Sequence, residues 1–251
     1  MTNKKALLLI SFVVIAVMAF LALSPGHQNT ALAKYESEAI TIAQTTTTET
    51  STTIPTIEYA NYSIYLPQGM DYKTSHPIVV AFSPSADAAS MIATWKNVAD
   101  RHQWIVYASK TFKNGISIGN PMLDVLIDLA ELEKKYPINN SRIIVTGFSG
   151  GAMFSHAFAY FYPQNVSAIV LNTGMISQIY YQNATYFYYY PKNKTAVFIA
   201  SPTDFRYEQM KQDKILLESL GWKTRWIEFT GGHTIAPESA YEEAAKWLEN
   251  E

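Results

Sequence analysis

Apolar runs of strand length alternate with stretches of helical spacing from Ile57 to the end of the chain. Residues 76–82 (HPIVVAF) form a short apolar run, as expected for a strand that is buried on both faces. In residues 90–103, Met91 and Trp95 recur at helical spacing. Further strands are expected at 57–67, 104–109, 141–149, 166–174, 195–201 and 223–232, and further helices at 120–137, 150–163, 207–221 and 237–251. This alternation predicts an α/β fold with a mostly parallel sheet and helices on both faces.

One of the expected helices carries clear end signals. In residues 120–137, Asn120 is suited to cap the N-terminus and Pro121 to occupy the first helical position. The segment ends at Pro137, which cannot continue a helix. We therefore expect this helix to begin at Pro121, with Asn120 as its N-cap.

The N-terminal residues differ from the rest of the chain. Lysines at positions 4 and 5 precede an uncharged apolar run, residues 6–24, that approaches the ~20 residues of a membrane-spanning helix. Ala31-Leu32-Ala33 has the small-x-small pattern of a signal-peptidase site. Residues 1–33 are therefore expected to be either a cleaved signal peptide or an N-terminal membrane anchor. Both alternatives place the remaining chain outside the cell.

A linker is expected between this segment and the domain. Residues 34–56 are rich in threonine and serine and lack apolar periodicity, so they predict a disordered, hydroxyl-rich linker. Residues 57–251 then form one domain. Glycosylation sequons agree with export and occur at Asn61, Asn139, Asn165, Asn183 and Asn193.

Composition excludes several classes of function. The 251 residues carry a formal net charge of −2, which argues against a nucleic-acid partner. There is no cysteine, so disulfides and a cysteine nucleophile are excluded. The five histidines show no metal-ligand spacing, and no metal or other cofactor is expected. A membrane contact is expected only through the N-terminal segment.

Residues 147–151 read GFSGG, between a β-branched strand and a helix of small and aromatic residues. A G-x-S-x-G pattern between a strand and a helix is typical of a nucleophile elbow, a sharp turn that exposes the serine. Gly147 and Gly151 would leave room for close approach of the strand and the helix. The helix N-terminus would stabilise negative charge beside Ser149. Ser149 is the predicted nucleophile; the alternative is a glycine-rich turn without chemistry.

A serine hydroxyl is a poor nucleophile until a base accepts its proton. His233 is the candidate base, because it lies in a glycine-rich loop after the last expected strand. His76 precedes a strand and therefore lies at the opposite end of the sheet. His102 ends a helix, and His156 lies two turns into the helix after Ser149, where a packing role is expected.

The acid of a catalytic triad should follow a strand that precedes the histidine. Asp204 lies just past the apolar strand 195–201, where it can orient an imidazole. Glu228 is the rival, but it lies inside the last strand; a simple turn aspartate is the other alternative for Asp204. The order Ser149, Asp204, His233 is the order that α/β-hydrolases use.

Residues 57–251 resemble the α/β-hydrolase superfamily. Within it the chain is similar to small secreted esterases related to polyhydroxybutyrate depolymerases and feruloyl or acetylxylan esterases. The matching segments are RIIVTGFSGGAM around Ser149, SPTDF around Asp204 and GGHT around His233. The resemblance implies ester hydrolysis through an acyl-enzyme intermediate, with a small-molecule or polymer-linked ester as substrate.

One loop departs from the pattern of these esterases. They commonly carry His-Gly after the first buried strand, and the residue after that pair donates one N–H to the oxyanion. Here Ser83-Pro84 stands in that place, and proline has no N–H. By position Ser85 would be the donor, with Ala86 or a serine hydroxyl as the fallback. Gly150, after the nucleophile, would supply the second N–H.

Residues 178–195 are unusually rich in tyrosine and lie between two expected strands, where this fold often carries cap insertions. One hypothesis is that the aromatic residues line or cover a site for a bulky ester, with Tyr188 and Tyr189 as substrate-binding residues. The members are Tyr180, Tyr181, Tyr186, Phe187, Tyr188, Tyr189 and Tyr190. The alternative is that alternate tyrosines pack a short strand or cover the sheet edge.

These observations favour an exported serine hydrolase that cleaves carboxylic esters. Two alternatives stay open. A prolyl-oligopeptidase-like peptidase carries a similar serine motif, although such enzymes normally add a large second domain. A non-catalytic surface-binding domain would account for the altered loop at Ser83-Pro84, because one fold hosts many functions.

Overall fold

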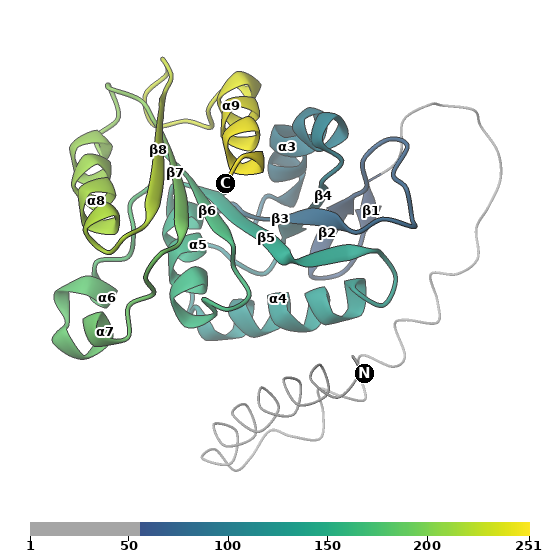
Figure 1. Ribbon diagram of the computed structural model, residues 1–251, viewed down its shortest axis with the longest axis horizontal. Coiled ribbons are helices and arrows are strands. Elements are labelled where there is room, and N and C mark those ends of the chain that lie inside the picture. Colours follow the sequence, from purple (N-terminus) through teal and green to yellow (C-terminus); the bar gives the residue numbers. More distant parts are fainter. Residues whose placement is uncertain (1–55) are drawn as a thin grey trace, which may run out of the picture. The chain divides into compact units, whose positions relative to one another are not determined.

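The computed structural model describes residues 56–251, apart from the side chains of residues 179 and 181 (Figure 1). Its strands form one eight-stranded sheet in the order β1-β2-β4-β3-β5-β6-β7-β8. The strands are β1 (Ile57–Glu58), β2 (Tyr62–Tyr65), β3 (His76–Phe82), β4 (Ile105–Ser109), β5 (Ile138–Phe148), β6 (Ala168–Asn172), β7 (Thr195–Ala200) and β8 (Lys223–Glu228). The β1–β2 and β2–β4 pairs are antiparallel, and all the other neighbouring pairs, including β4–β3 and β3–β5, are parallel. The expected mostly parallel sheet is confirmed.

Helices cover both faces of the sheet, as expected. The helices are α3 (Ala88–His102), α4 (Gly119–Leu132), α5 (Gly150–Phe161), α6 (Ile179–Gln182), α7 (Ala184–Tyr188), α8 (Tyr207–Ser219) and α9 (Glu238–Glu249). Helices α3 and α9 pack side by side and share one buried cluster with the sheet (Figure 1). Helices α4, α5 and α8 share the cluster on the other face. None of the helices between residues 56 and 251 is long and apolar enough to cross a membrane.

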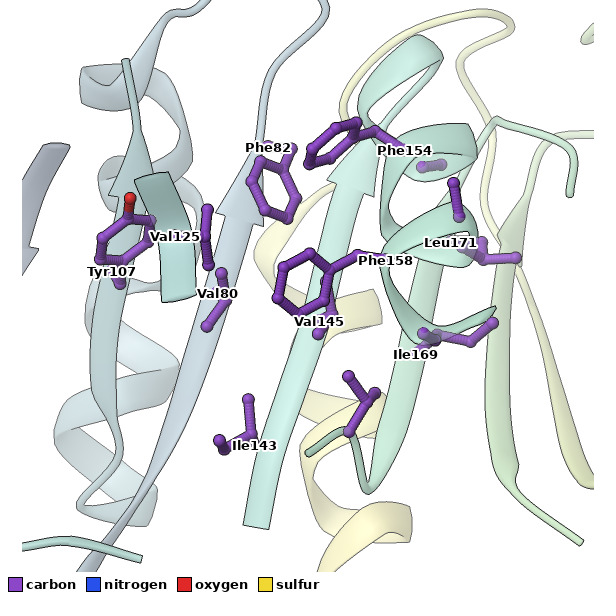
Figure 2. Close-up of a cluster of buried hydrophobic side chains, with 14 of the residues drawn as sticks. Val80, Phe82, Tyr107, Val125, Ile143, Val145, Phe154, Phe158, Ile169 and Leu171 are labelled. Carbon is purple, nitrogen blue, oxygen red and sulfur yellow. The ribbon is translucent and has the colours of Figure 1, made fainter. Parts of the chain in front are cut away.

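Strand β3 shows how the sequence pattern builds two cores at once. Val80 and Phe82 face the cluster under α4 and α5, whereas Val79 and Ala81 face the cluster under α3 and α9. All four side chains are fully buried. Because successive side chains of a strand point to opposite faces, a continuous apolar run fills both cores. Figure 2 shows Phe82 at the end of its strand, facing Phe154 of α5.

Two expected elements differ in detail. The single strand expected at 57–67 is instead a tight hairpin, because the N–H of Tyr59 donates to the carbonyl of Tyr62 (2.8 Å) and reverses the chain. Helix α4 begins at Gly119 rather than at Pro121, and its N-cap is Ile118, so Asn120 as the N-cap was wrong. The N–H of Met122 donates to the carbonyl of Ile118, which places the helix start two residues earlier without a side-chain cap.

Helix α5 approaches β3 more closely than any side chain would allow. A Cβ atom on Gly151 would lie 2.1 Å from the carbonyl oxygen of Phe82, and one on Gly147 would lie 2.3 Å from the carbonyl carbon of Gly151. Both neighbours are backbone atoms inside regular elements, so they cannot rotate away. The two glycines therefore set the depth at which α5 rests on the sheet, and with it the position of the turn between β5 and α5.

We expect Gly151→Ala to destabilise the fold by at least ~1–3 kcal/mol, the usual cost of inserting a methylene into a packed core. Urea unfolding measures the change. Gly119→Ala is the matched control, because nothing lies within 4 Å of its notional Cβ and alanine favours a helix by up to ~1 kcal/mol. Equal stability of the two variants would contradict the close-packing argument.

Candidate active site

Ser149 lies on a strained turn between β5 and α5. Its backbone has φ 53° and ψ −116°, a conformation that residues other than glycine rarely adopt. Such strain costs ~1–3 kcal/mol and persists only where the surroundings impose it. Here the N–H of Ser149 donates to the carbonyl of Asn172 at the end of β6 (3.0 Å), and α5 starts at the next residue. The turn has the geometry of a nucleophile elbow.

Three side chains form a continuous hydrogen-bond chain at this turn. His233 Nε2 lies 2.9 Å from Ser149 Oγ, and His233 Nδ1 lies 2.7 Å from Asp204 Oδ2. A carboxylate only accepts hydrogen bonds, so Nδ1 carries the proton and Nε2 is left to accept from the serine hydroxyl. The Asp204 side chain is fully buried, whereas that of His233 is 27% exposed. The structure therefore brings together all three residues predicted as a triad.

The rival residues lie elsewhere. Glu228 accepts hydrogen bonds from Tyr207 Oη and Trp226 Nε1 on the exposed side of β8. His76 is held between backbone carbonyls of Asp71 and Gln103 at the start of β3, the far end of the strand from the elbow. His102 lies at the end of α3 beside two glutamates of α9. The fourth rival, His156, lies on α5 itself, and its partners are described below.

Two polar residues that the sequence analysis missed hold the histidine loop in place. Asn172 is fully buried at the end of β6, and its Oδ1 accepts hydrogen bonds from the N–H of Ala236 (3.0 Å) and from Tyr241 Oη (2.7 Å). Ser201 Oγ, just after β7, accepts from the N–H of Gly232 (2.9 Å). Their signal in the sequence is a polar residue at the end of an otherwise apolar strand. They anchor the loop on both sides of His233.

The two residues predicted to bind an oxyanion differ in their present partners. Gly150 is the first residue of α5, where an N–H has no acceptor within the helix. The N–H of Ser85 donates a long hydrogen bond to Ser83 Oγ (3.3 Å), and the two serine hydroxyls lie 3.1 Å apart. The N–H of Gly150 is therefore available to an oxyanion, whereas the N–H of Ser85 already donates to Ser83 Oγ within its own loop.

Aromatic rings flank the imidazole of His233. The ring of Phe148 lies 5.3 Å and that of Phe205 4.6 Å from it, centroid to centroid. Phe205 is 72% exposed, an unusual position for a large apolar side chain. The guanidinium of Arg206 lies 5.0 Å from the Phe205 ring. Phe205 was missed in the sequence because nothing in SPTDF distinguishes it from an ordinary loop residue.

Comparison with known proteins fits this geometry. The family described as Phospholipase/Carboxylesterase matches residues 83–188, less than half of the chain, and the match contains Ser149 but ends before Asp204. A thermostable esterase has a TM-score of 0.58 at 19% identity, over 75% of this chain and 58% of that one. Esterase PE8 has a TM-score of 0.58 at 16% sequence identity, and the match covers 74% of this chain and 96% of that enzyme. The Bacillus cereus carboxylesterase has a TM-score of 0.57 at 16% sequence identity, and the match covers 76% of this chain and 95% of that enzyme.

The chain has the α/β-hydrolase fold. No curated protein sequence matches it. The family match and the solved structures support the resemblance to esterases that the motifs indicated. The chain spans only about 58% of the thermostable esterase, so that enzyme carries further residues beyond the shared hydrolase fold. Between residues 56 and 251, no group of three or more acidic or histidine side chains is placed to hold a metal ion.

In this α/β-hydrolase fold, the tyrosine-rich segment forms two short helices, α6 and α7, so the alternative of a packed short strand was wrong. Tyr188 and Tyr189 are 80% and 70% exposed, and their rings contact each other edge to face at 5.0 Å. Tyr180 and Tyr190 are buried instead. The segment therefore contributes both to the core and to an exposed aromatic surface.

His156 joins the tyrosine segment to α5. The N–H of Ser177 donates to His156 Nδ1 (3.0 Å), so Nε2 carries the proton and donates to Tyr190 Oη. Burial lowers the pKa of His156 to about 3, which keeps the imidazole neutral at physiological pH. The packing role expected for this histidine fits these contacts.

Asp213 of α8 holds the chain just before the tyrosine-rich segment, at Ile176. Its carboxyl accepts hydrogen bonds from the N–H of Ile176 (2.8 Å) and from Gln209 Nε2 (2.8 Å). Burial raises the pKa of Asp213 to about 6, because water no longer solvates the charged form. The carboxyl thus binds its proton more tightly in the folded than in the unfolded chain. Its contribution to stability is present below about pH 4 and is lost as the pH rises through about 6.

We expect Asp213→Asn, which removes this titration, to gain stability relative to the unmodified chain as the pH rises from 4 to 7. The gain is on the order of 3 kcal/mol, because the pKa rises from its usual 3.8 to about 6. Urea unfolding at pH 4, 5, 6 and 7 measures it. Glu208→Gln, at an exposed position of the same helix, is the control. A difference between Asp213→Asn and the unmodified chain that stays constant with pH would contradict the argument.

Proposed function

We propose that this chain is a serine hydrolase that cleaves carboxylic esters through an acyl-enzyme intermediate. The observation that carries the proposal is the hydrogen-bond chain from Ser149 through His233 to the buried Asp204, at a strained turn. A strained serine costs stability and has no structural benefit of its own. A base within hydrogen-bond reach of a nucleophile, itself oriented by a third group, is the arrangement that activates a serine.

In the first half of the reaction, Ser149 Oγ attacks the ester carbonyl carbon while its proton passes to His233 Nε2. The carbonyl oxygen becomes an oxyanion, which the N–H groups of Gly150 and Ser85 would bind. The buried carboxylate of Asp204 stabilises the imidazolium without taking its proton. When the C–O bond to the alcohol breaks, the leaving alcohol takes the proton from His233. The acyl group stays on Ser149.

In the second half, a water molecule takes the place of the alcohol. His233 accepts a proton from this water while the water oxygen attacks the acyl carbon. The second tetrahedral intermediate collapses, Ser149 leaves with the proton from His233, and the free acid is released. The proposed reaction uses only side chains, backbone N–H groups and water, so the proposal includes no metal and no other cofactor.

An apolar part of the substrate fits the surroundings of the triad. Phe205 is largely exposed, and its ring lies against the imidazole of His233. A group bound next to the scissile ester would cover this ring and remove its apolar surface from water, at a gain of roughly 25 cal/mol per Å². We therefore propose esters with an apolar acyl or alcohol group, either small or linked to a polymer.

Export is a separate proposal. It depends on the apolar residues 6–24, which lie outside the described residues. A signal peptide and a membrane anchor remain the two alternatives, and each places the hydrolase outside the cell. A chain recovered from the culture medium with a new N-terminus after residue 33 would indicate a cleaved signal peptide. A chain recovered from the membrane fraction with residues 6–24 still attached would indicate an anchor.

The first test compares the full chain with its Ser149→Ala variant. We expect a fluorophosphonate probe to label the unmodified chain and not the variant, and turnover of p-nitrophenyl acetate to fall by at least ~10³-fold, since the variant lacks the nucleophile. Mapping of the labelled peptide measures the reaction with the probe. The absorbance of the released p-nitrophenol measures the turnover.

Three results would count against the proposal in different ways. A folded chain that neither labels nor turns over would favour a non-catalytic binding domain. Hydrolysis of a short peptide amide without ester hydrolysis would favour a peptidase. Equal turnover by the unmodified chain and Ser149→Ala would mean that another group performs the reaction.

Tyr188 and Tyr189 are candidates for a surface that binds larger esters. We propose that their exposed rings support bulky or polymer-linked substrates, because a flat ring with a polar tip suits sugars and aromatic groups. The double variant Tyr188→Ala/Tyr189→Ala should keep its turnover of p-nitrophenyl acetate and lose ~10-fold in kcat/KM on a feruloylated or polymeric ester. Steady-state kinetics on both substrates measure this, with Tyr72→Phe, another exposed tyrosine, as the control. Unchanged kinetics on every bulky ester would exclude the role.

A further inference from the structure

The loop after β3 is a weak source of hydrogen-bond donors for an oxyanion. Pro84 has no N–H, and the N–H of Ser85 is directed at Ser83 Oγ (3.3 Å). A site that stabilises an oxyanion usually offers at least two donors at 2.7–3.1 Å, and loss of one costs ~10²–10³ in rate. If Gly150 supplies one donor, the second has to come from Ser85 or from a different residue.

A second loop, residues 110–115 after β4, lies directly against this one. Lys113 forms an isolated antiparallel bridge with Ser85, and the N–H of Asn114 donates to the carbonyl of Pro84 (2.8 Å). The loop is itself anchored, because Phe112 is buried with its ring stacked on Phe154 at 4.2 Å. The two loops therefore form one unit, and the position of Asn114 is set by backbone hydrogen bonds and by a core residue.

The side chain of Asn114 lies over Gly150. A Cβ atom on Gly150 would be 1.8 Å from Asn114 Oδ1, 2.7 Å from Cγ and 2.9 Å from Nδ2. The carboxamide thus occupies the space into which any other residue at position 150 would project its side chain. This gives a reason for glycine at this position of GFSGG, where neither a positive φ nor a backbone clash requires it.

The Asn114 carboxamide makes no hydrogen bond to another group in the described part of the chain, and the residue is exposed. Its two N–H donors are therefore free to meet a ligand. The carboxamide therefore lies next to Gly150, whose N–H is the first donor of the proposed oxyanion site. The carboxamide can turn about its own axis to present Nδ2 rather than Oδ1.

We propose that Asn114 is a third member of the oxyanion site and donates a hydrogen bond from Nδ2 to the developing negative charge. This inference rests on the proposed function, since it needs a serine that attacks a carbonyl. It compensates for the N–H of Ser85, the expected second donor, which is directed at Ser83 Oγ instead. The amide is neutral and remains solvated in the ground state, so its bond to the oxygen strengthens as negative charge develops in the transition state.

The test compares the full chain with Asn114→Ala, Asn114→Asp and the control Asn120→Ala, an exposed asparagine at the start of α4. With p-nitrophenyl acetate, Asn114→Ala should lower kcat by ~10²–10³-fold and change KM by less than ~3-fold. Asn114→Asp keeps the shape but places a carboxylate beside the oxyanion, so it should lower kcat at least as much. Asn120→Ala should match the unmodified chain.

A second measurement uses a transition-state mimic. Phenylboronic acid forms a tetrahedral adduct with an activated serine, and its binding should weaken by at least ~10-fold in Asn114→Ala. A kcat within ~3-fold of the unmodified chain in Asn114→Ala or in Asn114→Asp would overturn the inference while leaving the proposed function intact. Equal turnover by the unmodified chain and Ser149→Ala would overturn both.

Discussion

The close contact between the N-terminus of α5 and the sheet is the constraint on which the site depends. Gly147 and Gly151 bring the helix against the backbone of β3 and β5, and the chain turns between them through the strained conformation of Ser149. The surrounding core supplies the free energy that offsets this strain, since Phe82, Phe154 and the neighbouring side chains are almost completely buried. The nucleophile is therefore held by the packing of the fold together with the hydrogen bond from its own N–H to the carbonyl of Asn172.

The polar parts of the site are built on the same principle. The Asp204 carboxylate is buried, and it is tolerated there because it accepts hydrogen bonds from His233 and from the N–H of Arg206 (2.6 Å). Asn172 and Ser201 satisfy backbone groups of the histidine loop from the ends of two neighbouring strands. An imidazole on a loop is thereby positioned by rigid elements, while its outer edge stays open beside an exposed ring.

Several of these features could be predicted from the sequence, and others could not. Apart from α6, α7 and the hairpin near Tyr59, the strands and helices were expected within a few residues, because apolar periodicity reports which side chains a local element buries. Ser149, Asp204 and His233 were named because each stands just past a recognisable strand. The hairpin at Tyr59 was missed, since a single backbone hydrogen bond decides between a turn and a continuous strand. The start of α4 was misplaced by two residues, because helix ends depend on which carbonyl accepts the first bond.

The sequence by itself determined the α/β fold class, the order of its elements and the three residues of the proposed triad, because these follow from local periodicity and from motifs of a few adjacent residues. Only the tertiary structure decided that Asn114 lies over Gly150 and that Phe205 lies on His233. The physical reason is the register of parallel strands, which brings loops far apart in the chain to one edge of the sheet. No pattern within a single loop records which side chain of another loop it will meet.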